Sequence, residues 1–143
     1  MSGRRQVAAL PVRQDPKSGR LEVLLVTTLD TGRWVIPKGW PWPDRPDHEA
    51  AAEEAREEAG VVGTIAKKSV GSYSYGKRRK DGSVTDVTVH VFRLDVAEEK
   101  KSWPEKKRRR REWVAPDEAA ERVLEEGLKD ILAGLVKVRK KPG

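Results

Sequence analysis

The chain has 143 residues, of which 36% are hydrophobic and 37% are charged, and its formal net charge is +7. This length fits one domain with a buried core, and the absence of cysteine excludes disulfides and thiolate metal sites, which favours a cytoplasmic location. No apolar run approaches the roughly 18 residues of a membrane span, and the N-terminus lacks the pattern of a signal peptide, so we expect no membrane partner.

The charge is distributed unevenly along the chain. Residues 1–65 hold 9 Lys/Arg and 10 Asp/Glu, whereas residues 66–143 hold 21 and 13. The second half therefore suits a polyanion, which could be nucleic acid, a membrane surface or a small molecule dense in phosphate. Because the chain has only two histidines, any bound metal should be a hard cation on oxygen ligands.

The first half predicts strands that lead into one helix. Apolar stretches favour strands at 5–13, 21–28 and 33–37, with a turn at 15–20. The proline-rich stretch 38–47 should be a loop. Residues 48–60 are strong helix formers, with Asp47 placed to cap the helix and Gly60 placed to end it.

The second half predicts a hairpin and then helices. Strands are expected at 67–78 and 83–96 around an RKDG turn, followed by a charged connector at 98–111 and a short strand at 112–116. Helices should follow at 117–124, with Asp117 as a cap, and at 127–138. The pattern predicts a single α/β (α+β) sandwich with a core at about 5–136 and a basic tail at 137–143.

The helix at 48–60 carries an unusual concentration of acid. Glu53, Glu54, Glu57 and Glu58 lie within two turns, where like charges repel. On a helical projection Glu54, Glu57 and Glu58 share one sector beside an apolar stripe of alanines, so their carboxylates are expected to converge. A solvated face is the alternative, but oxygen ligands on a rigid element suit Mg²⁺, or Mn²⁺ in its place.

The segment from Gly39 to Val61 resembles the signature of the Nudix hydrolase family, G-x(5)-E-x(7)-R-E-U-x-E-E-x-G-U, in which U is a bulky aliphatic residue. The six positions in register are Gly39, Glu54, Glu57, Glu58, Gly60 and Val61. The departures are Arg45 in place of Glu, Glu53 in place of Arg, and the small Ala55. Since both charges are inverted, one hypothesis is an ion pair between Arg45 and Glu53 with its ends exchanged; two unrelated surface residues are the other.

The resemblance implies a Nudix-type alpha-beta-alpha sandwich, with a mixed sheet, a catalytic loop-helix and a C-terminal helix. It also implies that Glu54 and Glu58, together with Glu57, hold a divalent metal beside the backbone carbonyl of Lys38 and Gly39, and that Glu57 is the catalytic base. Trp103 and the Arg111-Glu112-Trp113 segment resemble the diphosphoinositol-polyphosphate and diadenosine-polyphosphate hydrolase branch.

Basic residues near this predicted edge are candidates for binding phosphate. Lys38 precedes the signature glycine, and Arg4, Arg5 and Arg33 are the other candidates. The basic run at 106–111 fits a rim that attracts polyphosphate, a nucleic-acid patch or a solvated loop.

Three functions remain open from the sequence. The first is Mg²⁺-dependent hydrolysis of a phosphoanhydride bond in a small substrate. This substrate is either linked to a nucleoside diphosphate or highly phosphorylated, and a diphosphoinositol polyphosphate or a dinucleoside polyphosphate is favoured. The second is a Nudix module that binds a nucleotide or RNA without hydrolysis. The third, a nucleic-acid-binding protein whose acidic helix is incidental, is the least favoured. The sequence does not decide between a monomer and a homodimer.

Overall fold

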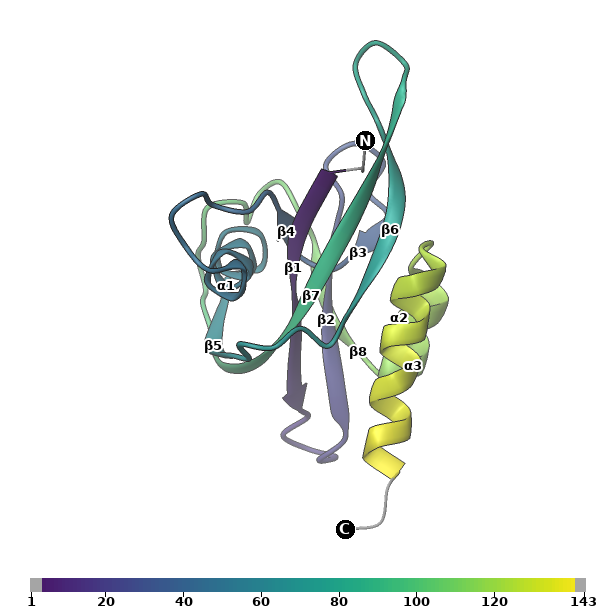
Figure 1. Cartoon of the computed structure of the whole chain (residues 1–143). Coiled ribbons are helices and arrows are strands. Elements are labelled where there is room, and N and C mark those ends of the chain that lie inside the picture. Colours follow the sequence, from purple (N-terminus) through teal and green to yellow (C-terminus); the bar gives the residue numbers. More distant parts are fainter. Residues whose placement is uncertain (1–3, 141–143) are drawn as a thin grey trace.

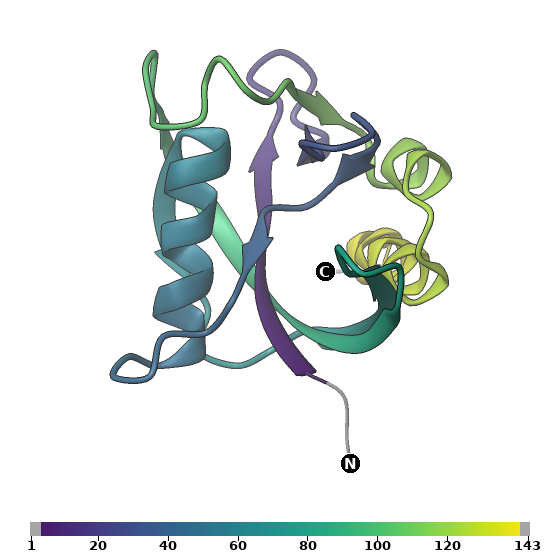
Figure 2. The same ribbon diagram turned by 90° about the horizontal axis from the view of Figure 1, so that it is seen from above.

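The computed structural model describes residues 4–140, with side chains described as far as Leu135. Eight strands form one mixed sheet: β1 (Arg4–Gln14), β2 (Leu21–Thr27), β3 (Trp34–Val35), β4 (Lys38–Gly39), β5 (Val61–Ile65), β6 (Gly71–Arg78), β7 (Val84–Glu99) and β8 (Arg111–Val114). The helices are α1 (Asp47–Ala59), α2 (Pro116–Arg122) and α3 (Glu126–Lys140). Helix α1 covers one side of the sheet, and α2 and α3 cover the other (Figures 1 and 2).

The central strands are buried on both sides because both faces carry a helical layer. Along β1, Val7 and Ala9 face the layer that contains α1, while Ala8 and Leu10 face the layer that contains α3. Side chains alternate across a strand, so the apolar run at positions 7–10 supplies both layers. This arrangement confirms the predicted α/β sandwich.

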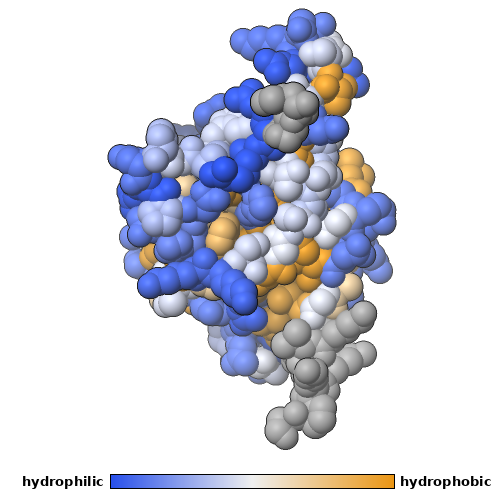
Figure 3. All heavy atoms as spheres, viewed as in Figure 1, coloured by the Kyte–Doolittle hydropathy of each residue, from blue (hydrophilic) through white to orange (hydrophobic). Residues whose placement is uncertain are grey.

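The path of the sheet places β1 at its centre. Strand β1 pairs in parallel with β7, and its other edge pairs antiparallel with β2 and with the short β4. Strands β6 and β7 form a long hairpin that projects from the body at the same end as the start of β1 (Figure 1). The projecting end is mostly hydrophilic on the face shown in Figure 3.

Most of the predicted elements are confirmed, with differences at their ends. The expected loop at 38–47 begins with strand β4, in which Lys38 and Gly39 pair with Ala8 and Val7. Strand β5 follows Gly60 directly and has no counterpart among the predicted strands. Both differences have one cause, which is that pairing with a distant strand decides whether such short segments are extended.

The two predicted caps are wrong. Pro46 precedes α1 and Ala115 precedes α2, and neither helix start has a side-chain capping hydrogen bond. Asp47 instead accepts a hydrogen bond from Arg5 at 3.0 Å. Gly60 ends α1 as predicted, with a φ of 68° in the left-handed region that favours glycine. Of the predicted basic tail, residues 137–140 belong to α3, and residues 141–143 lie outside the described residues.

Candidate active site

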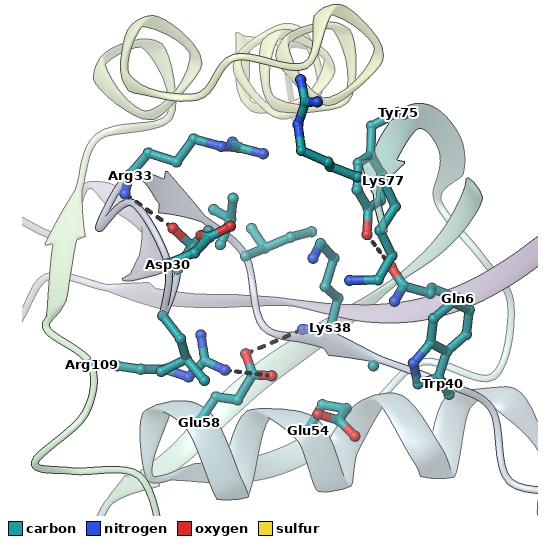
Figure 4. A pocket seen from close by; sticks show the side chains of 17 residues that line it. Gln6, Asp30, Arg33, Lys38, Trp40, Glu54, Glu58, Tyr75, Lys77 and Arg109 are labelled. Carbon is teal, nitrogen blue, oxygen red and sulfur yellow. Dashed lines mark hydrogen bonds and ion pairs between the residues drawn. The ribbon is translucent and has the colours of Figure 1, made fainter. Parts of the chain in front are cut away.

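A cleft of about 540 Å³ opens beside α1, with β4 at its base and β6 on its far wall (Figure 4). Its walls bring together acids from the helix and cations from four separate segments of the chain. The ionisable residues that line it are Asp30, Arg33, Lys38, Glu54, Glu58, Lys77, Arg78 and Arg109. The cleft is therefore acidic on its α1 side and, apart from Asp30, its other charged residues are basic.

Glu54 and Glu58 form the acidic side, one helical turn apart. Glu58 is buried, and one of its oxygens lies 3.4 Å from the backbone N–H of Lys38. Burial raises the pKa of Glu54, and the charge of Glu58 raises it further. Burial also raises the pKa of Glu58, against the opposing effect of Arg109. Two carboxylates held so close together, one buried and one partly buried, are a donor set that favours a divalent cation.

Strand β4 brings the backbone of Gly39 against this pair of carboxylates. A Cβ at Gly39 would lie 2.7 Å from Oε1 of Glu54 and closer still to the other two atoms of the carboxylate group. Only glycine leaves this space to the carboxylate, because a Cβ approaching so closely would displace it. The peptide of Lys38 and Gly39 thus lies where a backbone oxygen could add to the two carboxylates, and the donor set fits a hard cation.

Three of the cations around the cleft have defined partners. Lys38 is largely buried with its Nζ 5.0 Å from the centroid of the Tyr75 ring, and burial lowers its pKa. Arg33 donates to Glu125 at 2.7 Å. Arg109 lies 3.5 Å from Glu58 and donates to the carbonyl oxygen of Thr27. These contacts hold positive charge within the cleft.

The three glutamates do not converge as the helical projection predicted. In the described part of the chain, no three His, Asp or Glu side chains lie close enough together to hold a metal by themselves. Glu57 does not line the cleft, and its carboxylate lies 3.8 Å from Arg56. Adjacent helical residues differ by about 100°, which turns Glu57 away from Glu58 in this structure. Glu54, Glu58 and the β4 backbone are thus the candidate metal ligands that already lie in the cleft, and metal binding by Glu57 stays a prediction.

Of the four predicted phosphate-binding residues, Arg33 and Lys38 line the cleft, and Arg4 and Arg5 do not. Arg5 pairs with Asp47 and so ties the start of β1 to the start of α1. Arg4 lies over the Trp40 ring at 4.5 Å and lines a second pocket of about 320 Å³. This pocket is otherwise lined by Lys77, Arg78, Arg79, Lys80, Thr85, Val87 and Trp40.

The second pocket adjoins the cleft, because Trp40, Lys77 and Arg78 line both. None of its lining residues is acidic, and the residues of the hairpin tip, 76–84, are exposed. The two hollows together form a path that runs from the glutamate pair to a purely cationic end.

The exchanged ion pair between Arg45 and Glu53 is absent from the described residues. Arg45 pairs with Glu49 at 3.1 Å and lies over Trp42, while Glu53 pairs with Arg56. Arg45, just before α1, meets a partner four residues later, and Glu53 meets one three residues later. Side chains at these spacings are neighbours on a helix.

The basic run at 106–111 is divided by the structure. Arg109 and Arg111 turn inward, and Lys106, Lys107, Arg108 and Arg110 are exposed. Arg109 therefore belongs to the cleft, which the charge run alone did not indicate. Tyr75 and Lys77 are cleft residues that the sequence reasoning missed. Their spacing of two along one strand was the available signal, since it places both on one face.

The NUDIX domain family profile matches residues 3–135 of the chain. Among curated relatives, "Nudix hydrolase 12, mitochondrial" of Arabidopsis thaliana is 38% identical over 107 residues, which cover 71% of this chain and 52% of that protein. "Diphosphoinositol polyphosphate phosphohydrolase 3-alpha" of Mus musculus is 33% identical over 101 residues, which cover 68% of this chain and 57% of that protein.

This chain spans about half to two thirds of the length of the first curated relatives that it matches. Among solved structures, an Ap4A hydrolase of C. elegans superimposes with a TM-score of 0.68 at 19% identity, covering 97% of this chain and 99% of that one. At this level of identity the superposition concerns the fold alone, and it confirms the arrangement that the signature predicted.

Proposed function

The chain belongs to the Nudix family, and from that premise we propose that it is a pyrophosphohydrolase that cleaves a phosphoanhydride bond in a small phosphorylated substrate, using a divalent cation. Residues 1–143 would act as one Nudix domain with its core at about 5–136. The observation that carries the proposal is the neighbouring pair Glu54 and Glu58 in a cleft whose other charged lining residues are, apart from Asp30, all cations.

The cation site comprises Glu54, Glu58 and the backbone carbonyl at Lys38 or Gly39. A divalent cation bound there, Mg²⁺ first and Mn²⁺ as its replacement, supplies the charge neutralisation that a phosphoanhydride needs before a nucleophile can approach. The protein's own part is to hold the two carboxylates side by side on α1 and to shield Glu58 from water. Burial of Glu58 serves this part directly.

Glu57 is proposed as the base that takes a proton from the attacking water. Partial burial raises its pKa first, and the charge of Glu53 raises it further, which moves this carboxylate toward the range of a general base. Its side chain is partly exposed and lies just outside the cleft, so a change of rotamer would be needed to bring it to the attacking water. Glu57 would thus act from the edge of the site, while Glu54 and Glu58 act from its floor.

Cations on the walls are proposed to hold the phosphates. Lys38 offers a point charge next to the glutamate pair, and Arg33 and Arg109 add guanidinium charge from two other parts of the cleft wall. Because they come from three different segments, they surround a phosphate group rather than line one side of it. This arrangement favours in-line positioning of the bond to be cleaved.

Within this reaction class we favour a highly phosphorylated substrate, such as a diphosphoinositol polyphosphate, over one with a single diphosphate link. The cationic second pocket adjoins the cleft and carries five Lys/Arg side chains with no acid. A dinucleoside polyphosphate is the next candidate, since Trp40 is exposed between the two hollows and could stack on a base. The mouse relative is named for diphosphoinositol polyphosphate and the C. elegans neighbour for Ap4A, which supports these two candidates respectively.

The test is a substrate panel of diphosphoinositol polyphosphates, diadenosine polyphosphates, nucleoside triphosphates and ADP-ribose, each assayed with Mg²⁺ and with Mn²⁺. Glu54→Gln and Glu58→Gln should each lower kcat at least about a hundredfold on the preferred substrate. Glu49→Gln, the same change on the same helix outside the cleft, is the matched control and should retain the wild-type rate.

Binding of a nucleotide or RNA without turnover of any substrate in the panel would contradict hydrolysis and favour the alternative of a Nudix binding module. Nucleic acid remains the less favoured partner, and size measurement in solution decides between monomer and homodimer. Within residues 4–140, every helix is too short or too polar to serve as a membrane span. A cytoplasmic location is part of the proposal, to be tested by cell fractionation because several relatives are named mitochondrial or chloroplastic.

A further inference from the structure

The last turn of α1, which carries Glu57 and Glu58, is held by a segment far away in the sequence. The last four carbonyls of a helix have no partner within it. Here the carbonyl of Arg56 accepts from the N–H of Gly60, and the other three accept from the connector that follows β7 and from Arg111 at the start of β8. The donors are the backbone N–H of Glu105 to Glu57 at 3.1 Å, Nε1 of Trp103 to Glu58 at 3.2 Å and Nη1 of Arg111 to Ala59 at 2.5 Å.

The indole of Trp103 is locked in place by two further contacts. A Cβ at Gly60 would lie 2.5 Å from the Trp103 ring, so the ring packs directly on the glycine backbone. The guanidinium of Arg111 lies 3.9 Å from the centroid of the same ring, and its second nitrogen donates to the carbonyl of Lys100 at 3.1 Å. The donors to α1 are therefore themselves fixed rather than free side chains.

The same connector reaches the other end of Glu58. Nη2 of Arg109 lies 3.5 Å from the Glu58 carboxylate, while Trp103 holds the carbonyl of that residue. Glu58 is thus contacted at its backbone and at its side chain by residues 45 and 51 positions further along the chain. Water and Gly60 would be enough to cap the end of this helix, so these extra contacts are not needed for capping alone.

We propose that Trp103 and Arg111 are positioning residues for the divalent-cation site. By holding the carbonyls of Glu58 and Ala59 they fix the rotation of the last helical turn, which keeps the Glu58 carboxylate facing Glu54 and Gly39. The inference rests on the proposed function, because it assigns a purpose to the position of Glu58. It adds two residues, outside the Nudix signature, that touch neither the substrate nor the cation.

The test is Trp103→Phe, which removes the indole N–H and keeps an aromatic ring on Gly60. Mn²⁺ binding to the substrate-free protein, measured from the EPR signal of free Mn²⁺, should weaken about tenfold. Hydrogen exchange at the amides of residues 57–60 should accelerate, kcat at low Mn²⁺ should fall, and excess Mn²⁺ should restore it. The KM of the preferred substrate at saturating Mn²⁺ should change less than twofold.

Trp113→Phe is the matched control. Trp113 also donates its indole N–H to a glutamate, Glu99 at 3.0 Å, and also lies under an arginine, Arg13, but it makes no hydrogen bond to α1. Its substitution should leave Mn²⁺ affinity and exchange in α1 unchanged. Arg111→Lys keeps the charge with fewer donors and should weaken Mn²⁺ binding about threefold, which provides a second measurement if Trp103→Phe does not fold.

The outcomes separate the two proposals. Mn²⁺ affinity and hydrogen exchange that stay at wild-type levels in both variants would overturn the positioning role alone. A wild-type protein that binds no Mn²⁺ and hydrolyses no substrate would overturn the proposed function, and the metal-directed role of these residues with it. Equal weakening by Trp103→Phe and Trp113→Phe would show a general loss of stability and would also overturn the positioning role.

Discussion

The two ends of the cleft are built in opposite ways. At the acidic end, Glu54 and Glu58 stand on a helix whose last turn is held by the connector, and the backbone of Gly39 packs directly against the Glu54 carboxylate. At the cationic end, the side chains come from exposed residues of the β6–β7 hairpin. The difference suggests a division of labour, since a ligand set for a cation needs fixed geometry, whereas attraction of a polyanion needs only charge density.

The largest expected effect comes from filling the space at the acidic end. Gly39→Ala places a Cβ against the Glu54 carboxylate, so we expect turnover and Mn²⁺ binding to fall about a hundredfold while the fold persists, because a side chain and not the backbone must move. Enzyme assay and circular dichroism measure the two effects. Gly134→Ala in α3, where a Cβ meets nothing within 4 Å, is the control and should keep full activity.

Removing charge at the cationic end should have a smaller and different effect. Lys77→Ala combined with Arg78→Ala should raise the KM of a highly phosphorylated substrate about tenfold, change kcat little, and flatten the dependence of KM on salt. The KM of ADP-ribose should rise less. An equal rise for both substrates would show that these cations serve the scissile phosphates, and the contrast between the two ends would be lost.

Without a bound cation, the carboxylates at the acidic end should lower the free energy of unfolding at neutral and alkaline pH. The pKa of Glu54 is raised in the folded protein, so the folded state holds more protons than the unfolded state between the unfolded and folded pKa values. Stability from this group is therefore highest below about pH 4.5, the ordinary range of a glutamate, and falls as pH rises through the raised pKa.

Glu54→Gln removes this pH-dependent cost. In the presence of a chelator we expect its Tm to exceed that of the wild type by about 2–4 °C at pH 8 and the difference to vanish below about pH 4.5, as measured by calorimetry. If Glu54→Gln is less stable than the wild type at pH 8, the carboxylate pair does not destabilise the cation-free protein, and the prediction is wrong.

The smallest effect is expected at the inverted positions of the signature. A double-mutant cycle between Arg45 and Glu53 should give a coupling energy below about 0.3 kcal/mol, because each residue has its own partner. The cycle between Arg45 and Glu49, an exposed i+4 pair, should give about 0.3–0.5 kcal/mol. A larger coupling for Arg45 and Glu53 would restore the exchanged pair.

Local patterns in the sequence were sufficient for the elements and for the core of the site. The signature register from Gly39 to Val61, the apolar runs of β1 and β2 and the stop at Gly60 depend on neighbours within a few residues, so they can be recognised without the fold. The same register points to Glu54 and Glu58, which line the cleft, and to Glu57, which does not, because the step of about 100° between adjacent helical residues turns Glu57 away from Glu58.

Only the tertiary structure decided what surrounds those carboxylates. Strand β4 exists because β1 offers it a partner, and Arg109 enters the cleft because the connector packs on the end of α1. Trp103 reaches the carbonyl of Glu58 across 45 residues of sequence. Contacts of this kind produce no periodic pattern in the sequence, because they depend on which distant groups the folded chain brings together.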